Sequence, residues 1–225
     1  MEMKTFLINF ALILTLTSCT NTPERETGEI KTLQLLKQAF EERNRSKIFI
    51  DSRTLLSREK INAANIPVLF VELKSGQNGT LTPYPGQGIG QTWLGADGAT
   101  ITMERGILKA SRGMGDDLMG SYSSMPSWSK IDNGITTYQR QLIYTSGNNK
   151  ILKHSFECNI EKSNSQEVIE IWDINFFVTK FKENCSNNEF EIKNTYYVDD
   201  QEIVRRASQY HSETLGYIFI ERLDR

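Results

Sequence analysis

The sequence predicts a mostly β protein in which antiparallel strands follow one another as a meander and curl into a barrel-like domain, preceded by one N-terminal helix. Two observations predict this fold. Segments with alternating apolar and polar side chains recur from Ile66 onward, and short turns rich in glycine, asparagine or serine separate most of them. One apolar and one polar face per strand is typical of a barrel or a strongly curled sheet.

The first residues have the organisation of a bacterial lipoprotein signal. The apolar run Phe6–Leu16 is too short to cross a hydrocarbon core of ~30 Å, but it has the length of the apolar part of a secretory signal. It leads directly into Leu16-Thr17-Ser18-Cys19, which matches the lipobox pattern. We therefore expect a signal peptide over residues 1–18, lipid attachment at Cys19 and a flexible polar tether over residues 19–29.

This start also predicts where the mature chain resides. Acyl chains on Cys19 would make membrane attachment effectively permanent. The next residue is Thr20 rather than an aspartate, which favours the outer membrane under the usual bacterial sorting rule. We expect a lipid-anchored protein of the outer membrane that faces the periplasm.

The remaining residues, 30–225, are expected to form one β-rich periplasmic domain. Its first element is predicted to be a helix over residues 30–43, because Leu33, Leu36 and Phe40 recur at helical spacing. Lysine and arginine number 26 and aspartate and glutamate 28, for a net charge of −2. Without a basic stripe, nothing in the chain points to nucleic acid as a partner.

Short segments predict the first half of the barrel. Residues 99–104 alternate cleanly, with Ala99, Ile101 and Met103 on one face. The expected strands are 67–73, 91–94, 99–104 and 107–111. Glycines and aspartates over residues 112–120 are expected to form a loop.

Longer segments predict the second half. Residues 151–160 place His154, Phe156, Cys158 and Ile160 on one face. Turns are expected at 146–149 and at 163–165, where serine and asparagine cluster. The expected strands are 135–144, 151–160, 167–179, 189–197, 202–210 and 216–223.

Two cysteines remain once Cys19 carries the lipid. Cys158 and Cys185 form an even pair in an oxidising compartment, so we expect a structural disulfide between them. A metal site would need more ligands, and the only two histidines, His154 and His211, lie far apart in the sequence. No metal or other cofactor is predicted.

Catalytic arrangements find little support. Asp97, Glu104, Asp116 and Asp117 fall in one region, and a glycosidase needs two nearby carboxylates, but turn and loop roles explain these residues as well. Ser111 and Ser121 lie near glycines without a histidine in that half of the chain, which argues against a serine nucleophile. Arg105 and Arg112 could pair with Asp116 or Asp117 or with an acidic sugar, and we expect structural ion pairs rather than sugar contact. We predict no catalytic residue.

Aromatic residues leave two readings open. Aromatic side chains can stack on sugar rings, and they also fill β cores. The residues in question are Trp93, Trp128, Tyr138 and Tyr144.

Several motifs occur in an order that resembles a known family. Trp93-Leu94-Gly95-Ala96-Asp97-Gly98 is followed by Arg105-Gly106-Ile107-Leu108 and Gly113-Met114-Gly115-Asp116-Asp117-Leu118. The tail contains Tyr197-Val198-Asp199 and then Arg206-Ala207-Ser208-Gln209-Tyr210. This order, together with the lipobox and the late cysteine pair, resembles the group 4 capsule polysaccharide lipoproteins, the YjbF/GfcB/YmcC family.

The resemblance implies a barrel-like fold and a non-enzymatic accessory role in export or assembly of an extracellular or capsular polysaccharide. It implies an outer-membrane barrel protein and periplasmic capsule or exopolysaccharide proteins as partners. Glycine-rich loops let a partner approach the backbone closely, and the residues expected to contact a partner or glycan are Trp93, Asp97, Gly98, Arg105, Gly106, Gly113, Gly115 and Asp117. The alternatives are a lipid- or glycan-binding carrier and a polysaccharide-modifying enzyme.

Overall fold

The computed structural model describes most of the chain beyond residue 50. The described residues are 51–86, 90–131, 134–145 and 150–225. The expected signal peptide, Cys19, the tether and the helix over residues 30–43 all lie outside them. All of the described residues belong to one compact unit, residues 50–225. No helix in the described ranges is long and apolar enough to cross a membrane.

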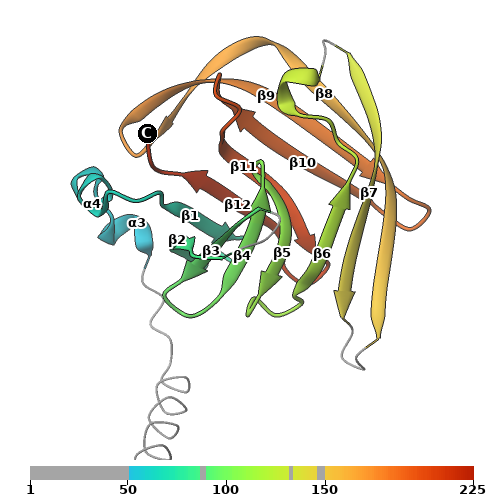
Figure 1. The fold of residues 1–225 in the computed structure, drawn as a ribbon, viewed down its shortest axis with the longest axis horizontal. Helices are drawn as coiled ribbons and strands as arrows, with labels where there is room; N and C mark the ends of the chain where they lie inside the picture. The colour runs from blue at the N-terminus through green and yellow to red at the C-terminus, as the bar shows by residue number, and fades with distance from the viewer. Residues whose placement is uncertain (1–50, 87–89, 132–133, 146–149) are drawn as a thin grey trace, which may run out of the picture. The chain divides into compact units, whose positions relative to one another are not determined.

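Twelve antiparallel strands form one sheet that curls into a nearly closed barrel (Figure 1). The strands are β1 (Leu69–Leu73), β2 (Asn78–Tyr84), β3 (Gln91–Gly95), β4 (Thr100–Glu104), β5 (Ile107–Arg112), β6 (Leu118–Ser123), β7 (Ile135–Thr145), β8 (Ile151–Ile171), β9 (Ile174–Ser186), β10 (Glu191–Val198), β11 (Val204–Ser212) and β12 (Gly216–Arg222). The spatial order runs from β5 back to β1, then from β12 back to β6. The predicted fold class is confirmed.

The two ends of the barrel carry different turns, because consecutive antiparallel strands reverse direction. One end, which we call the β4–β5 end, also carries the β2–β3 and β10–β11 turns and the β6–β7 connection. The other, the β5–β6 end, also carries the β1–β2, β3–β4 and β11–β12 turns. Residues that are near in sequence but on successive turns therefore lie at opposite ends of the molecule.

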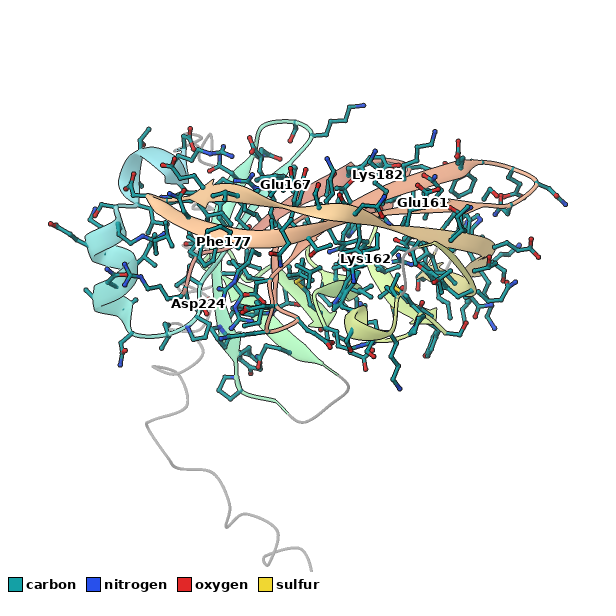
Figure 2. All side chains as sticks on the ribbon, turned by 90° about the horizontal axis from the view of Figure 1, so that it is seen from above. Glu161, Lys162, Glu167, Phe177, Lys182 and Asp224 are labelled. Carbon is teal, nitrogen blue, oxygen red and sulfur yellow. A yellow bond between two sulfur atoms is a disulfide. The ribbon has the colours of Figure 1, made fainter. Side chains whose placement is uncertain are left out.

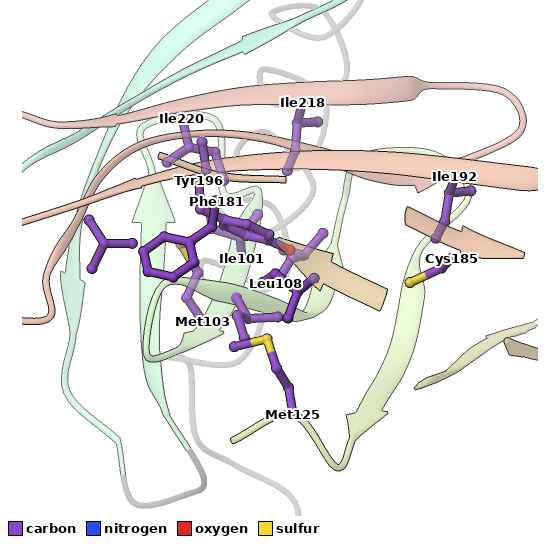
Figure 3. Close-up of a cluster of buried hydrophobic side chains, with 14 of the residues drawn as sticks. Ile101, Met103, Leu108, Met125, Phe181, Cys185, Ile192, Tyr196, Ile218 and Ile220 are labelled. Carbon is purple, nitrogen blue, oxygen red and sulfur yellow. The ribbon is translucent and has the colours of Figure 1, made fainter. Parts of the chain in front are cut away.

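Large side chains fill the barrel interior (Figure 3). Trp128 enters it from the 3-10 helix η1 (Trp128–Lys130), in the β6–β7 connection. Its ring centroid lies 5.0 Å from that of Phe181 and 5.1 Å from that of Tyr196. Tyr196 and Phe156 are themselves fully buried. The interior is thus a packed core, which places any binding site at the ends or on the outer wall.

A second, smaller core joins two short helices to one part of the sheet. Helices α3 (Ser52–Leu55) and α4 (Arg58–Ala64) precede β1, and Ile61 of α4 is buried in this cluster. The guanidinium of Arg58 donates to the carbonyl oxygens of Ile171, Trp172 and Leu223 at 2.6–2.8 Å. These helices lie outside the predicted elements, and long-range contacts of this kind hold them in place.

The longest hairpin differs from its prediction. Strand β8 runs without a turn through residues 163–165, where a register shift between Lys162 and Gln166 absorbs the extra residues. The chain reverses instead at Trp172 and Asp173, whose φ values are 44° and 65°. The predicted turn at 163–165 and the single strand over 167–179 are wrong. A tertiary contact fixes the position of this turn. The centroid of the Trp172 ring lies 5.0 Å from that of the Phe70 ring on β1.

Two strands were not predicted. Strand β2 contains Gly79 and Pro83, and β6 contains Gly120, and both residue types are uncommon in strands. The predicted loop over 112–120 therefore extends too far, because β6 begins at Leu118. Both segments are strands because they pair with neighbours, β2 with β1 and β3, and β6 with β7.

The disulfide joins two neighbouring strands on the inner face of the barrel. Cys158 on β8 and Cys185 on β9 are direct cross-strand partners, and their sulfur atoms are bonded. Both residues are fully buried among apolar side chains. The predicted pairing and the predicted inward face of residues 154–160 therefore agree with the structure.

Candidate functional site

A cavity of about 310 Å³ opens at the β4–β5 end. Its buried apolar lining consists of Leu69, Trp93, Met103, Ala207 and Ile220. More exposed side chains complete the lining, and those that carry charge are Glu104, Arg105, Glu202 and Arg222. An apolar floor with polar groups around it is the usual composition of a binding pocket.

The predicted contact residues separate into two groups. Trp93, Arg105 and Gly106 meet at this cavity. The other five, Asp97, Gly98, Gly113, Gly115 and Asp117, lie in the β3–β4 and β5–β6 turns. These turns belong to the opposite end of the barrel. The eight residues therefore do not form one continuous surface.

Arg105, beside the cavity, forms hydrogen bonds with two residues of the β6–β7 connection. Its guanidinium donates from Nη2 to the carbonyl oxygen of Met125 at 3.1 Å, and its own carbonyl accepts from the Trp128 indole at 3.0 Å. It therefore ties the β4–β5 turn to the connection that plugs the barrel.

Arg112, at the other end of β5, links this strand to β6 through hydrogen bonds to backbone carbonyls. Its guanidinium donates to the carbonyl oxygens of Ser111 and Leu118, the latter at 3.0 Å. Both arginines bond backbone carbonyls, so the predicted ion pairs with Asp116 or Asp117 are wrong. The two edge strands β5 and β6 are bridged by side chains where the described sheet has no ladder between them.

Gly106 and Gln209 bring two of the sequence motifs together. The side-chain amide of Gln209 donates to the carbonyl oxygen of Gly106 and accepts from the backbone N–H of Leu108, both at 2.9 Å. Gln209 is fully buried on β11, so inside the barrel it satisfies one backbone group of the β4–β5 turn and one of β5. In the sequence Gln209 is part of a motif, but no local pattern indicates this role, because its two partners are about 100 positions away.

We expect Gly106→Ala to lower the free energy of unfolding much more than Gly98→Ala. Both glycines have positive φ, 80° and 84°, so each alanine costs about 1 kcal/mol of backbone strain. At Gly106 a Cβ would also lie 2.1 Å from Cγ2 of Val204, whereas at Gly98 nothing lies within 4 Å. Such overpacking adds about 1–3 kcal/mol. Urea unfolding of both variants measures the difference, and equal losses would contradict this explanation.

A buried polar pair lies at the seam between β5 and β6. Ser111 Oγ is 2.8 Å from Nε2 of His211, and it accepts from the backbone N–H of Leu118 at 2.9 Å. Within the described residues Nδ1 of His211 has no hydrogen-bond partner. Burial lowers the pKa of His211, against the opposing effect of the carboxylates of Asp117 and Asp116.

This pair corrects one step of the sequence reasoning. A histidine from the other half of the chain does reach Ser111, because β11 lies across the barrel from β5. Both side chains are fully buried, however, and neither lines the cavity. A substrate has no access to the hydroxyl, and the pair bridges strands.

The four surface carboxylates do not converge. Asp97 accepts from the backbone N–H of Ala99, and Asp117 accepts from those of Gly113 and Met114. Asp116 is exposed in the same turn as Asp117. Glu104 lies at the opposite end and pairs with Lys109 at 2.9 Å. Turn and ion-pair roles therefore account for three of them, and Glu104 lies at the opposite end of the barrel from the other three.

One carboxylate lies deep in the barrel. Glu183 pairs with Arg140, with Nη1 2.8 Å from Oε2, and the two side chains are 1% and 2% exposed. The carboxylate also accepts from the Asn194 amide and from the hydroxyls of Tyr138 and Tyr196. Glu183 lies near both disulfide sulfurs, but their bond leaves no thiolate to hold a metal. This cluster is a structural network, although Nε of Arg140 has no hydrogen-bond partner among the described residues.

The aromatic residues favour the core reading. Trp128 and Tyr138 are buried in the barrel. The hydroxyl of Tyr144 donates to the carbonyl oxygen of His211. Trp93 borders the cavity but is only 5% exposed.

Comparison with known proteins identifies a family and a related solved structure. The family described as group 4 capsule polysaccharide lipoprotein gfcB, YjbF matches residues 33–223. The crystal structure of the hypothetical lipoprotein YmcC from Escherichia coli (K12) has a similar fold, with a TM-score of 0.66 and 18% identity. The similarity covers 76% of this chain and 89% of the YmcC chain. A comparison with curated proteins found no match.

Proposed function

This chain belongs to the group 4 capsule polysaccharide lipoprotein family, and from that premise we propose that it assists the export or assembly of an extracellular polysaccharide without catalysing a reaction. In this proposal it is anchored through Cys19 to the outer membrane, faces the periplasm and binds an outer-membrane barrel protein. Periplasmic proteins of the same export system are further partners.

The packed interior is the observation that carries the non-enzymatic role. Side chains such as Tyr196, Phe156 and Trp128 occupy the space in which a barrel enzyme or a deep carrier would hold its substrate. The inward carboxylate, Glu183, is already bonded to Arg140. A protein of this kind acts through its surface.

The cavity at the β4–β5 end is the proposed contact site for the outer-membrane partner. Its apolar floor suits an apolar side chain that the partner inserts, and buried anchors of this kind supply much of the affinity at protein interfaces. Glu202 and Arg222 beside the floor offer charges of both signs to the surrounding contact. Trp93, Arg105 and Gly106, all predicted from the sequence, belong to this site.

The experiment places a charge in this cavity. Ile203 is half-buried and lines the cavity, and its two hydrogen bonds with Asp199 involve only its backbone. Ile203→Lys can therefore fold while blocking an apolar anchor. Ile151→Lys is the matched control, because Ile151 is 66% exposed at the start of β8, away from the cavity. Tagged full-length variants are used to capture partners from mildly solubilised outer membranes, and mass spectrometry quantifies them.

We expect the unmodified protein to enrich an outer-membrane barrel protein, and Ile203→Lys to reduce its recovery about tenfold, equivalent to about 1.4 kcal/mol of binding free energy. Ile151→Lys should recover the partner normally. Absence of any enriched barrel protein would overturn the partner-binding role. Equal recovery by both lysine variants would place the contact elsewhere.

A carrier role is the second candidate, and the apolar lining of the cavity favours it. A volume of about 310 Å³ accommodates a small lipid or glycan fragment. Native mass spectrometry of the protein purified from its own cells distinguishes the two functions. A bound small molecule that is lost in Ile203→Lys supports the carrier.

A further inference from the structure

An exposed tyrosine lies on the outer wall of the barrel, away from the cavity. Tyr122 on β6 is 64% exposed, an unusual degree for a large aromatic side chain. Its ring rests against Gly120, because a Cβ at that glycine would lie 3.4 Å from the ring. The backbone thus supports the ring while most of its surface remains free.

Neutral polar side chains continue from this ring across the sheet. Tyr122 pairs with Gln141 on β7, and Gln141 pairs with Ser155 on β8. The side-chain amide of Gln141 donates to Ser155 Oγ at 3.1 Å. The three side chains therefore form one row that crosses three strands on the outer face.

A second row runs parallel to the first. Thr137 on β7, Asn159 on β8 and Asn184 on β9 are successive cross-strand partners. Glu161 and Lys182, which Figure 2 labels on β8 and β9, are cross-strand partners on the same outer face, two residues farther along the strands. Between the two rows, Gln139 on β7 pairs with Glu157 on β8, whose exposed carboxylate is the charge inside this otherwise neutral area, and Glu161 and Lys182 form its charged border. We call the two rows of uncharged residues, together with Tyr122, the Tyr122 face.

We propose that the Tyr122 face binds an extended polysaccharide chain lying across strands β6 to β9. This inference rests on the proposed function, to which it adds a direct contact with the transported polymer. The contact is separate from the cavity, so the protein can hold the polymer on its wall and the outer-membrane partner at the β4–β5 end.

The chemistry of the face fits a sugar polymer better than a membrane. An aromatic ring stacks on the apolar face of a sugar ring, and amide and hydroxyl side chains both donate to and accept from sugar hydroxyls. Neighbouring strands lie about 4.8 Å apart, a spacing on the scale of one sugar residue. A lipid surface would favour a larger apolar area with cations around it.

The experiment measures binding of polysaccharide by the full-length, detergent-solubilised lipoprotein. The probe is the polysaccharide extracted from cells that produce this protein, and binding is measured by isothermal titration calorimetry. The variants are Tyr122→Ala, Tyr122→Phe and Gln141→Ala. Phe177→Ala is the matched control, because Phe177 is a 68% exposed aromatic residue on another part of β9.

We expect Tyr122→Ala to weaken binding about tenfold, the combined effect of lost stacking and lost contact area. Tyr122→Phe keeps the ring and should stay within about twofold of the unmodified protein. Gln141→Ala should weaken binding by a smaller factor, and Phe177→Ala should leave it unchanged.

Two results would overturn this inference. One is a lack of polysaccharide binding by the unmodified protein, and the other is equal binding by Tyr122→Ala and Phe177→Ala. If Tyr122→Ala instead abolished capture of the outer-membrane protein, the face would be a protein interface. In each case the Ile203→Lys capture experiment still tests the proposed function independently, so failure of the two proposals can be told apart.

Discussion

Replacing Arg140 by methionine is expected to lower the free energy of unfolding by about 3–5 kcal/mol, because it leaves the carboxylate of Glu183 buried without its counter-charge. Nη1 of Arg140 lies 2.9 Å from Oε1 and 2.8 Å from Oε2 of Glu183. No water can replace the lost partner in a core that large side chains fill. Urea unfolding at neutral pH measures the loss.

The double variant Arg140→Met/Glu183→Gln is the control, because the glutamine amide removes the charge and keeps an acceptor oxygen for the donors Tyr138, Asn194 and Tyr196. Removing both charges takes away the cost of desolvating them, so the double variant should recover much of the lost stability. If the single and double variants were equally unstable, packing around Arg140 would be the cause and the ion pair would contribute little.

Acid should affect the unmodified protein and the double variant differently. Burial by itself raises the pKa of Glu183, but Arg140 and the hydrogen bonds from Tyr138, Asn194 and Tyr196 outweigh it and hold the pKa below its ordinary value. A group with a lowered folded-state pKa stabilises the fold above its unfolded pKa, and this contribution is lost as the pH falls through the folded pKa. The unmodified protein should therefore lose more stability in acid than the double variant.

Removing the disulfide is expected to have the second large effect. Cys158 and Cys185 are 27 positions apart, and the chain-entropy relation gives about 3.5 kcal/mol for a loop of that length. The variant Cys158→Ala/Cys185→Ala should lose about this much free energy of unfolding, measured by urea unfolding under oxidising conditions. Both residues are fully buried in the core, so lost packing adds to the effect.

Reduced unmodified protein is the control for the packing contribution, because it keeps both sulfur atoms while releasing the cross-link. Its stability should lie between those of the oxidised protein and the alanine variant. A difference below about 1 kcal/mol between oxidised and reduced protein would show that the cross-link constrains the unfolded chain little.

Local alternation predicted most of the barrel, because a strand with one buried face has an apolar side chain at every second residue. Phe156, Cys158 and Ile160 illustrate this on β8, where all three point into the core. The same rule failed at β2 and β6, whose glycines and proline weaken the pattern. The rule also put the turn of the β8–β9 hairpin at residues 163–165, where a bulge has the same composition as a turn. The actual turn contains Trp172, a residue type that is typical of a core.

The sequence could predict only part of the candidate site. Trp93, Arg105 and Gly106 were predicted as contact residues, and the structure brings them to one cavity. The residues after them in the sequence, from Gly113 to Asp117, belong to the other end because one further strand separates the two turns. Tyr122 drew no attention in the sequence, since its exposure depends on how β6 meets its neighbours.

By itself, the sequence determined the mostly β barrel, the family and the pair of cysteines, because strand periodicity, motif order and cysteine number are local or countable properties. Tertiary structure alone decided that Gln209 holds Gly106, that His211 reaches Ser111 and that Glu183 meets Arg140. These contacts join residues 43 to 103 positions apart. Their partners are set by the curl and register of twelve strands, which no local pattern encodes.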